Sequence, residues 1–170
     1  MVSKKVFYGD REKRPKIPAP NFDAIPAALR RETRWMLWRL EWDTDRWSKV
    51  PKRASGGNAK SNDPATWTDF EAIQAAYGRG GFDGIGYALG DGFVGVDLDD
   101  CRDPATGACE EWAREIIDSL RSYAEVSPSA SGFKVFCRGE WRGDWTKKPY
   151  GSGAVEVYTR QYFAVTGTLA

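Results

Sequence analysis

Short apolar segments fill the second half of the chain, and they restrict its possible folds more than any other feature. Each is rich in β-branched or aromatic residues and is bounded by Gly, Pro or Ser, as strands usually are. They cover residues 84–89, 93–98, 123–129, 133–138, 154–158 and 162–166. A helical stripe of apolar positions over residues 109–122 interrupts the series. Consecutive strands with few helices favour an α+β fold over a regular alternation of strands and helices.

The N-terminal segment is predicted to differ from the rest of the chain. Residues 1–20 are rich in Lys, Arg and Pro and are predicted to form a flexible basic arm. Residues 21–170 are predicted to form the folded domain, and 170 residues suit one domain or one two-lobed domain.

Several local elements follow from capping and turn signals. Thr68, with Glu71 three residues later, is the predicted N-cap of a helix over residues 68–77. Gly90-Asp91-Gly92 predicts a hairpin-like turn between the strands at 84–89 and 93–98. The other predictions are a helix over 23–32, a buried strand over 34–42 and a long polar connection over 43–66.

Charge is distributed unevenly along the chain. The formal net charge is +1, yet residues 1–60 hold 15 Lys and Arg against 7 Asp and Glu, whereas residues 61–170 hold 10 against 17. This asymmetry indicates a polyanion contact beside a carboxylate-rich site, although a solvated basic tail would give the same count. Tryptophans crowd the basic half, where they either stack on bases or build the core: Trp35, Trp38, Trp42, Trp47 and Trp67.

Composition excludes several classes of site. Histidine is absent, which removes His-dependent catalytic triads and His metal ligands. Cys101, Cys109 and Cys137 are odd in number and lack a CxxC spacing, so we expect a reducing, cytoplasmic compartment without structural zinc. No run of about 18 apolar residues exists and the N-terminus lacks the apolar core of a secretory signal, so no membrane partner is expected.

The segment VGVDLDDC, residues 94–101, is the sharpest chemical signal. Side chains alternate along a strand, so Asp97 and Asp99 share one face. Two neighbouring carboxylates repel each other and are costly beside a core unless a cation pairs them. Mg²⁺ and Mn²⁺ prefer such oxygen ligands, so the pair predicts a divalent-cation site. A polar strand end or a capping cluster would give the same residue pattern.

Two later segments complete a candidate site. SPSASGFKVF, residues 127–136, is a Ser- and Gly-rich turn followed by a strand that carries Lys134, and it predicts a phosphate cradle or an ordinary turn. In AVEVY, residues 154–158, Glu156 is a carboxylate within an apolar strand and a candidate third metal ligand. Arg160 follows and offers a phosphate partner.

These three segments, in this order, resemble the primase-polymerase domain of the archaeo-eukaryotic primase superfamily, in particular the phage and plasmid bifunctional DNA primase/polymerases. The resemblance covers about residues 22–168, with support from WRLEW and from KVPKRASGGNAKSNDPATW in the first half. It implies a two-lobed α+β fold with an RRM-like, mixed or antiparallel catalytic sheet flanked by helices. It also implies that the chain is the N-terminal part of a larger replication protein.

The resemblance further implies roles for individual residues. Asp97, Asp99 and Glu156 would be catalytic residues that bind two divalent cations, Mg²⁺ or Mn²⁺. Ser129, Ser131, Lys134 and Arg160 would bind the dNTP or NTP. Lys134 stands where the family usually has His, and Ala130 replaces a more usual Gly. Lys49 and Lys52 match a basic loop and would bind nucleic acid, with template and nucleotide left open.

The implied activity is template-directed nucleotidyl transfer on a single-stranded or primed DNA template, with a C-terminal primase region or a helicase as partner. A metal-dependent nuclease would use the same carboxylates. A non-catalytic RRM-like module would instead bind single strands through exposed aromatic residues, with Phe133, Phe136 and Phe163 as candidates. Carboxylates on an RNA-facing sheet count against that last alternative.

Overall fold

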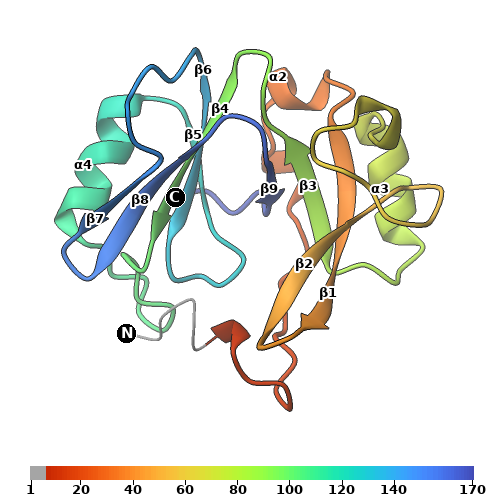
Figure 1. The fold of residues 1–170 in the computed structure, drawn as a ribbon, viewed down its shortest axis with the longest axis horizontal. Coiled ribbons are helices and arrows are strands. Elements are labelled where there is room, and N and C mark those ends of the chain that lie inside the picture. The colour runs from red at the N-terminus through yellow and green to blue at the C-terminus, as the bar shows by residue number, and fades with distance from the viewer. Residues whose placement is uncertain (1–6) are drawn as a thin grey trace.

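The computed structural model describes residues 7–170 and confirms the α+β class. Two antiparallel sheets lie beside each other (Figure 1). The strands are β1 (Trp35–Asp43), β2 (Arg46–Lys52), β3 (Gly84–Ala88), β4 (Phe93–Asp99), β5 (Tyr123–Val126), β6 (Phe133–Arg138), β7 (Lys147–Tyr150), β8 (Gly153–Tyr158) and β9 (Tyr162–Val165). The four-stranded sheet has the order β2-β1-β3-β9, and the five-stranded sheet has the order β5-β6-β4-β8-β7.

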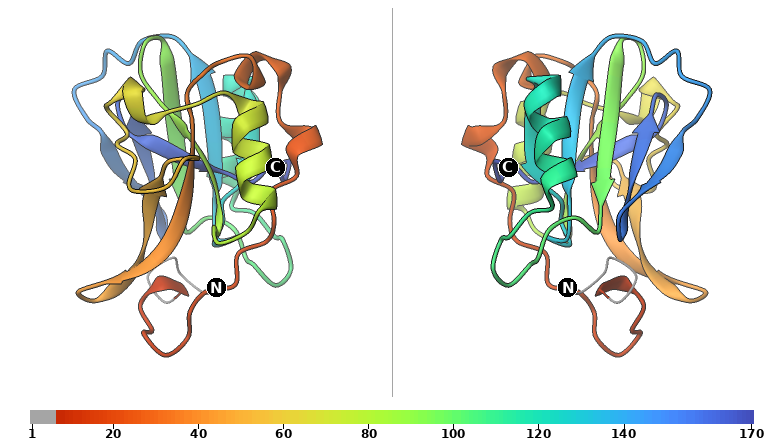
Figure 2. Two further views of the ribbon diagram at one scale, coloured as in Figure 1. Left: turned by 90° about the vertical axis from the view of Figure 1, so that its right-hand side faces the viewer. Right: turned by 90° about the vertical axis from the view of Figure 1, so that its left-hand side faces the viewer.

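Each sheet carries one longer helix on its outer face. Helix α3 (Phe70–Gly78) lies over the four-stranded sheet and α4 (Glu111–Leu120) over the five-stranded sheet (Figure 2). Short helical turns complete the set: η1 (Phe22–Ala24), α2 (Ala27–Arg30) and η2 (Pro64–Thr66). None of the helices in residues 7–170 combines the length and the apolarity needed to cross a membrane.

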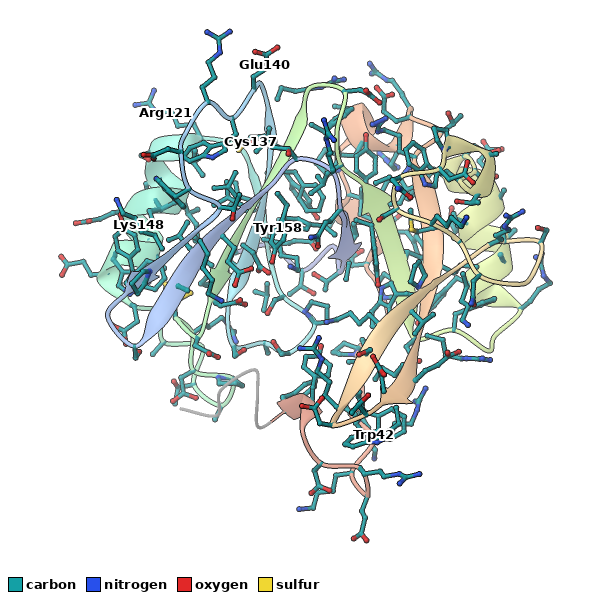
Figure 3. All side chains as sticks on the ribbon, viewed as in Figure 1. Trp42, Arg121, Cys137, Glu140, Lys148 and Tyr158 are labelled. Atoms are coloured by element: carbon teal, nitrogen blue, oxygen red, sulfur yellow. The ribbon has the colours of Figure 1, made fainter. Side chains whose placement is uncertain are left out.

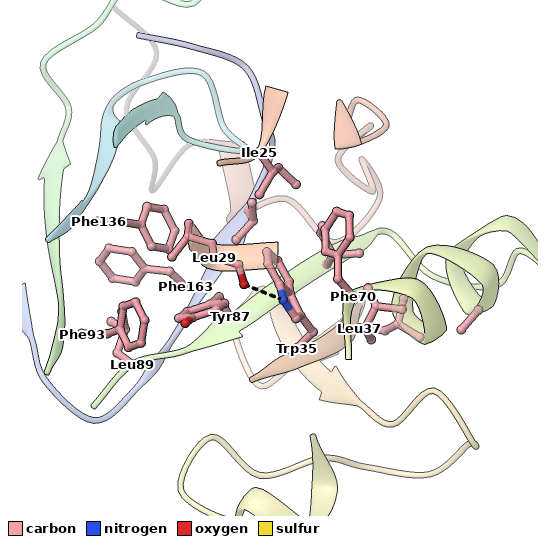
Figure 4. Packing of buried hydrophobic residues seen from close by; sticks show 14 residues of the cluster. Ile25, Leu29, Trp35, Leu37, Phe70, Tyr87, Leu89, Phe93, Phe136 and Phe163 are labelled. Carbon is pink, nitrogen blue, oxygen red and sulfur yellow. Dashed lines mark hydrogen bonds between the residues drawn. The ribbon is translucent and has the colours of Figure 1, made fainter. Parts of the chain in front are cut away.

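The largest hydrophobic cluster joins the two sheets. Trp35 of β1 and Tyr87 of β3 are fully buried and pack edge to face, with ring centroids 5.0 Å apart. Phe163 of β9 meets Phe136 of the other sheet in the same geometry, at 5.5 Å (Figure 4). The Trp35 indole N–H donates to the Leu29 carbonyl at 3.2 Å, so the buried ring leaves no polar atom unsatisfied. This cluster fixes the two sheets relative to each other.

A glycine in β4 permits a close contact between the sheets. A Cβ at Gly95 would lie 2.4 Å from the Phe163 ring and 2.7 Å from Leu89. The absent side chain therefore lets the Phe163 ring rest on the backbone of β4. Phe163 in turn lies next to Lys134 in the site described below.

Gly95→Ala is expected to lower the free energy of unfolding by about 1–3 kcal/mol, because it overpacks this contact. Gly78→Ala is the matched control, since a Cβ there meets nothing within 4 Å and alanine is favoured in a helix. Urea unfolding of both variants measures the difference. Equal stabilities would show that the sheets separate slightly at no cost.

The polar connection predicted over residues 43–66 is wrong in its first part, because β2 occupies Arg46–Lys52 there. This strand pairs with β1 over seven residue pairs, from Leu37↔Lys52 to Asp43↔Arg46. Lys, Arg and Pro have a low propensity for strands, so the sequence of β2 does not predict one. The strand forms because the long strand β1 supplies its hydrogen-bond partners. Thr44, with φ +53°, makes the tight turn of this hairpin.

The hairpin predicted at residues 90–92 is also wrong, because β3 and β4 belong to different sheets. Arg34 organises this crossover: it donates to the carbonyls of Ala88 at 3.0 Å and Gly90 at 2.9 Å. It also binds the Asp91 carboxylate at 2.7 Å. Gly90 and Gly92 have φ of +110° and +85°, which suits glycine and lets the chain turn away from its sheet.

Smaller differences concern helix ends and one missed strand. The predicted helix over 23–32 is divided into η1 and α2. Asp69, rather than Thr68, caps α3 by accepting the Ala72 N–H at 2.8 Å. Strand β7 was not predicted, since its sequence Lys-Lys-Pro-Tyr carries no strand signal. The strands at 34–42, 84–89, 93–98, 123–129, 133–138, 154–158 and 162–166 and the helix at 109–122 are confirmed within a few residues at their ends.

The segment predicted as a basic arm contacts the domain over its described part, residues 7–20. Tyr8 is buried in a cluster with Trp38, Leu40 and Ala164. The Trp47 indole N–H donates to the Asp10 carbonyl at 2.9 Å. Tyr8 and Asp10 therefore contact the four-stranded sheet, whereas the loop that follows them extends away from both sheets (Figure 1).

Candidate active site

A row of charged side chains crosses the inner face of the five-stranded sheet, opposite α4. The strand register places one residue of each strand in this row: Glu125 of β5, Lys134 of β6, Asp97 of β4, Glu156 of β8 and Lys147 of β7. Residues paired in this way have Cβ atoms about 5 Å apart. The alternate residues Val96 and Leu98 point to the α4 side and belong to its core cluster.

Asp97 and Lys134 form a buried ion pair at the centre of the row. Lys134 Nζ lies 2.9 Å from Asp97 Oδ2, and the two residues are only 8% and 3% exposed. The same ammonium group lies 4.1 Å from the centroid of the Phe163 ring. Buried charges of this kind need a partner, and each of these residues supplies it for the other.

Glu156 stands directly opposite Asp97 in the register. Its carboxylate accepts hydrogen bonds from the Lys147 ammonium group and from the Tyr158 hydroxyl. Two acids therefore face each other across β4 and β8, each next to a lysine. This arrangement makes Asp97 and Glu156 neighbours in space, although they lie far apart in the sequence.

Asp99 lies at the last position of β4, opposite Ala154, and is half-buried. Two glycines let the neighbouring chain segments approach the end of this strand. A Cβ at Gly132 would lie 2.0 Å from the Leu98 carbonyl oxygen, and one at Gly153 would lie 2.1 Å from the Asp99 carbonyl oxygen. The end of β4 is thus enclosed by the backbone of neighbouring segments. Asp99 lies two residues further along β4 than Asp97 and is not part of the charged row.

The serine turn lies next to the same end of β4. The Ser131 carbonyl accepts the backbone N–H groups of Cys101 at 3.0 Å and Arg102 at 3.1 Å. The hydroxyl groups of Ser127, Ser129 and Ser131 form a buried chain with spacings of 3.1 and 2.9 Å. Ser129 and Ser131 therefore lie near Asp99 and Asp100 rather than in the Asp97 row.

A cleft between the two sheets opens onto the Asp97–Lys134 pair. Its volume is about 160 Å³, and the Tyr158 side chain projects into the region between the sheets (Figure 3). The lining residues are Lys49, Asp97, Lys134, Tyr158, Gln161, Tyr162, Phe163 and Ala164. A larger hollow of about 490 Å³ lies near Arg30, Asp69 and Glu71, away from the acidic row. We regard the smaller cleft as the site, because the buried ion pair faces it.

The structure separates the predicted cationic residues. Lys49 lines the cleft, whereas Lys52 points away and binds Glu41 and Asn58 at 2.7 Å each. Arg160 is exposed in the turn between β8 and β9 and does not line the cleft. Sequence reasoning missed Glu125, Lys147, Gln161 and Tyr162, because only the strand register and the packing of the two sheets bring them to the row or the cleft.

Glu125 is a fully buried carboxylate at one end of the row. It accepts hydrogen bonds from Thr166 N at 2.8 Å, Gly167 N at 3.0 Å and the Tyr123 hydroxyl at 2.7 Å. Burial raises its pKa to about 7, against the opposing effect of these donors and of Lys134. These hydrogen bonds hold the backbone of residues 166 and 167 against β5, beside the site.

The aromatic residues considered for base stacking on the sheet are part of the core. Phe133 belongs to the cluster under α4, whereas Phe136 and Phe163 belong to the cluster between the sheets. Each is at most 5% exposed. They therefore offer no open ring face of the kind that RRM-type recognition uses.

The chemistry of the donors fits a hard divalent cation, with carboxylates facing each other on adjacent strands. Within residues 7–170, however, no three Asp, Glu or Cys side chains are gathered in a form that could hold one ion. Lys134 and Lys147 occupy the positions beside the two acids. Asp97 and Glu156 are therefore two facing carboxylates that lysines already pair, and Asp99 lies one step outside them.

Comparison with known proteins supplies an independent observation. No protein family model matches the chain. Over 84% of its length the chain is 38% identical to a DNA primase-polymerase of Nitratiruptor phage NrS-1. The chain spans about a fifth of the length of that relative. The chain is therefore similar to one part of a phage DNA primase-polymerase.

Proposed function

We propose that the chain is a catalytic domain of a DNA primase-polymerase that transfers nucleotides on a DNA template. The observation that carries this proposal is the buried Asp97–Lys134 pair, with Glu156 opposite, facing a cleft between two sheets. The similarity to the phage enzyme supports it independently. In this reaction a 3′-hydroxyl group loses its proton to solvent and its oxygen bonds to the α-phosphorus of a nucleoside triphosphate. The bond from that phosphorus to the oxygen bridging to the β-phosphate breaks, and pyrophosphate leaves with that oxygen.

The cleft suits the polyphosphate of the incoming nucleotide. Its volume of about 160 Å³ is below the roughly 300–1,000 Å³ of pockets that enclose a whole ligand. We therefore infer that it takes phosphate groups and leaves the sugar and base outside. Lys134 and Lys49 both line it and would neutralise phosphate charge, with Ser129, Ser131 and Arg160 as further candidate contacts.

Lys134 has a second effect on this chemistry. Because its ammonium group pairs with Asp97, it holds the buried carboxylate in place in the free protein. Asp97, Glu156 and Asp99 would hold Mg²⁺ or Mn²⁺, and such cations, when bound, make the 3′-hydroxyl more acidic and neutralise the triphosphate. Phe163 limits the positions that the Lys134 side chain can adopt, because its ring lies against the ammonium group.

The chain, incubated with labelled dNTPs or NTPs, Mg²⁺ or Mn²⁺ and either a primed or an unprimed template, tests the proposal. We expect incorporation that follows the template sequence and stops when EDTA is added. If products form only on the primed template, the chain extends primers but does not make them. Products on the unprimed template would show that it also synthesises primers. Shortened template without incorporation would identify a nuclease, and binding without any chemical change would identify a binding module; either result would contradict the proposal.

A further inference from the structure

Aromatic side chains line the inner face of the β1–β2 hairpin. The register places Trp42 opposite Trp47 and Leu40 opposite Lys49. Side chains alternate along each strand, so Trp42, Trp47 and Lys49 point to the same side of the hairpin. Lys49 also lines the cleft that holds Asp97, which makes this face continuous with the candidate active site.

A cation lies over each aromatic group along this face. The guanidinium group of Arg11 lies 6.0 Å from the Trp42 ring centroid, and that of Arg14 lies 5.7 Å from the Trp47 ring centroid. Nearer the cleft, Lys49 Nζ lies 4.3 Å from the ring centroid of Tyr8. We call the residues Arg11, Arg14, Trp42, Trp47 and Lys49 the cation–aromatic row. The Lys134–Phe163 contact continues the same pattern inside the cleft.

This row differs from the tryptophans that build the core. Trp35 and Trp38 are at most 1% exposed, whereas Trp42 and Trp47 retain solvent-exposed surface. The hairpin projects beyond the rest of its sheet (Figure 2), and Trp42 lies near its end, at the edge of the molecule (Figure 3). Arg11 and Arg14 are exposed as well. Trp47 packs on one side against the cluster of Tyr8, Trp38 and Leu40, and Trp42 packs edge to face on Trp47 with ring centroids 5.7 Å apart. The end of the hairpin thus holds two indole rings that remain partly open to solvent beside two exposed guanidinium groups.

We propose that the cation–aromatic row binds single-stranded DNA and leads it to the cleft. Unpaired bases stack on indole rings and on guanidinium planes, and the backbone phosphates need cations close to those planes. The excess of 15 Lys and Arg over 7 Asp and Glu in residues 1–60 matches the charge of such a ligand. This inference rests on the proposed function and identifies the surface along which the DNA template would reach the candidate active site.

The test is the binding of a fluorescently labelled oligo-dT strand, followed by anisotropy without metal or nucleotide. Trp42→Ala is expected to weaken binding about 5- to 150-fold, the effect of losing one stacked base. Trp42→Phe keeps a ring and should stay within a few-fold of the unaltered chain. Trp141→Ala is the matched control, because Trp141 is 37% exposed in the loop between β6 and β7 and packs against Trp145.

A second variant tests the phosphate contacts. Arg11→Ala combined with Arg14→Ala should lower the slope of log affinity against log salt by about 1.4, because each phosphate contact to a single strand contributes about 0.7. Arg14 also binds Asp83 at 2.7 Å, so thermal unfolding must show that the variant is folded. An unchanged slope in the folded variant would remove the two arginines from the binding site.

The outcomes separate this inference from the proposed function. Undiminished binding by Trp42→Ala, or equal affinity for duplex and single strand, would overturn the inference while leaving template-directed incorporation unaffected. Conversely, the chain could bind DNA in a way that depends on Trp42 and yet incorporate no nucleotide. That result would support the DNA-binding row and contradict the proposed enzymatic function. Support for both requires that Trp42→Ala raise the template concentration needed for half-maximal incorporation by the same factor as it weakens binding.

Discussion

Asp97→Asn is expected to reduce nucleotide incorporation by a factor on the order of 10³ while leaving the domain folded. The substitution keeps the volume of the side chain and removes its charge at the centre of the row, next to Lys134 and opposite Glu156. Single-turnover incorporation with labelled dNTP, at saturating template, measures the effect. Asp118→Asn is the control, because it makes the same chemical change on the exposed side of α4.

Stability and chemistry can be separated at this position. Asp97→Asn leaves the Lys134 ammonium group buried without its carboxylate, which costs free energy of folding. Asp97→Asn combined with Lys134→Met removes both charges and should restore much of the lost stability without restoring incorporation. An Asp97→Asn protein that incorporates nucleotides at the normal rate would exclude Asp97 from the reaction.

Glu125→Ala is expected to lower the free energy of unfolding by about 3–5 kcal/mol. The substitution removes the acceptor of two backbone N–H groups and of the Tyr123 hydroxyl at a position with no solvent exposure. Urea unfolding at pH 6 provides the measurement, with Glu115→Ala on the exposed face of α4 as the control.

The same carboxyl predicts a dependence on pH. Its pKa is raised in the folded protein to about 7 from an ordinary value of 4.5, so the folded state retains a proton that the unfolded state has lost between these values. Its contribution to stability is therefore complete below pH 4.5 and is lost as the pH rises through 7, a change of about 3 kcal/mol. Glu125→Gln does not titrate, so the difference in unfolding free energy between the two proteins should follow this curve. A difference that is constant from pH 4.5 to 7.5 would show that the carboxyl titrates normally.

Local patterns in the sequence account for most of the elements and for part of the site. Alternation within residues 94–99 places Asp97 on the face opposite Val96 and Leu98, because that rule depends only on neighbouring residues. The apolar stripe over 109–122 likewise predicts α4 and its buried face. The α+β class follows from the order of these elements.

Residue type alone did not distinguish between similar cations. Lys49 and Lys52 belong to the same strand, yet an odd number of positions separates them, so they point to opposite faces of the sheet. One lines the cleft, and the other binds Glu41 and Asn58. Without knowledge of β2 as a strand, this difference is invisible in the sequence.

The sequence by itself determined which residues lie on a common face of one strand, because side-chain direction repeats every two residues. Only the tertiary structure decided which strands are neighbours and in which register. It separated β3 from β4 and brought Glu125, Lys134, Asp97 and Glu156 into one row. The physical reason is that strand pairing is fixed by burial against distant residues, such as the Phe163 ring on Gly95, and no local pattern encodes that contact.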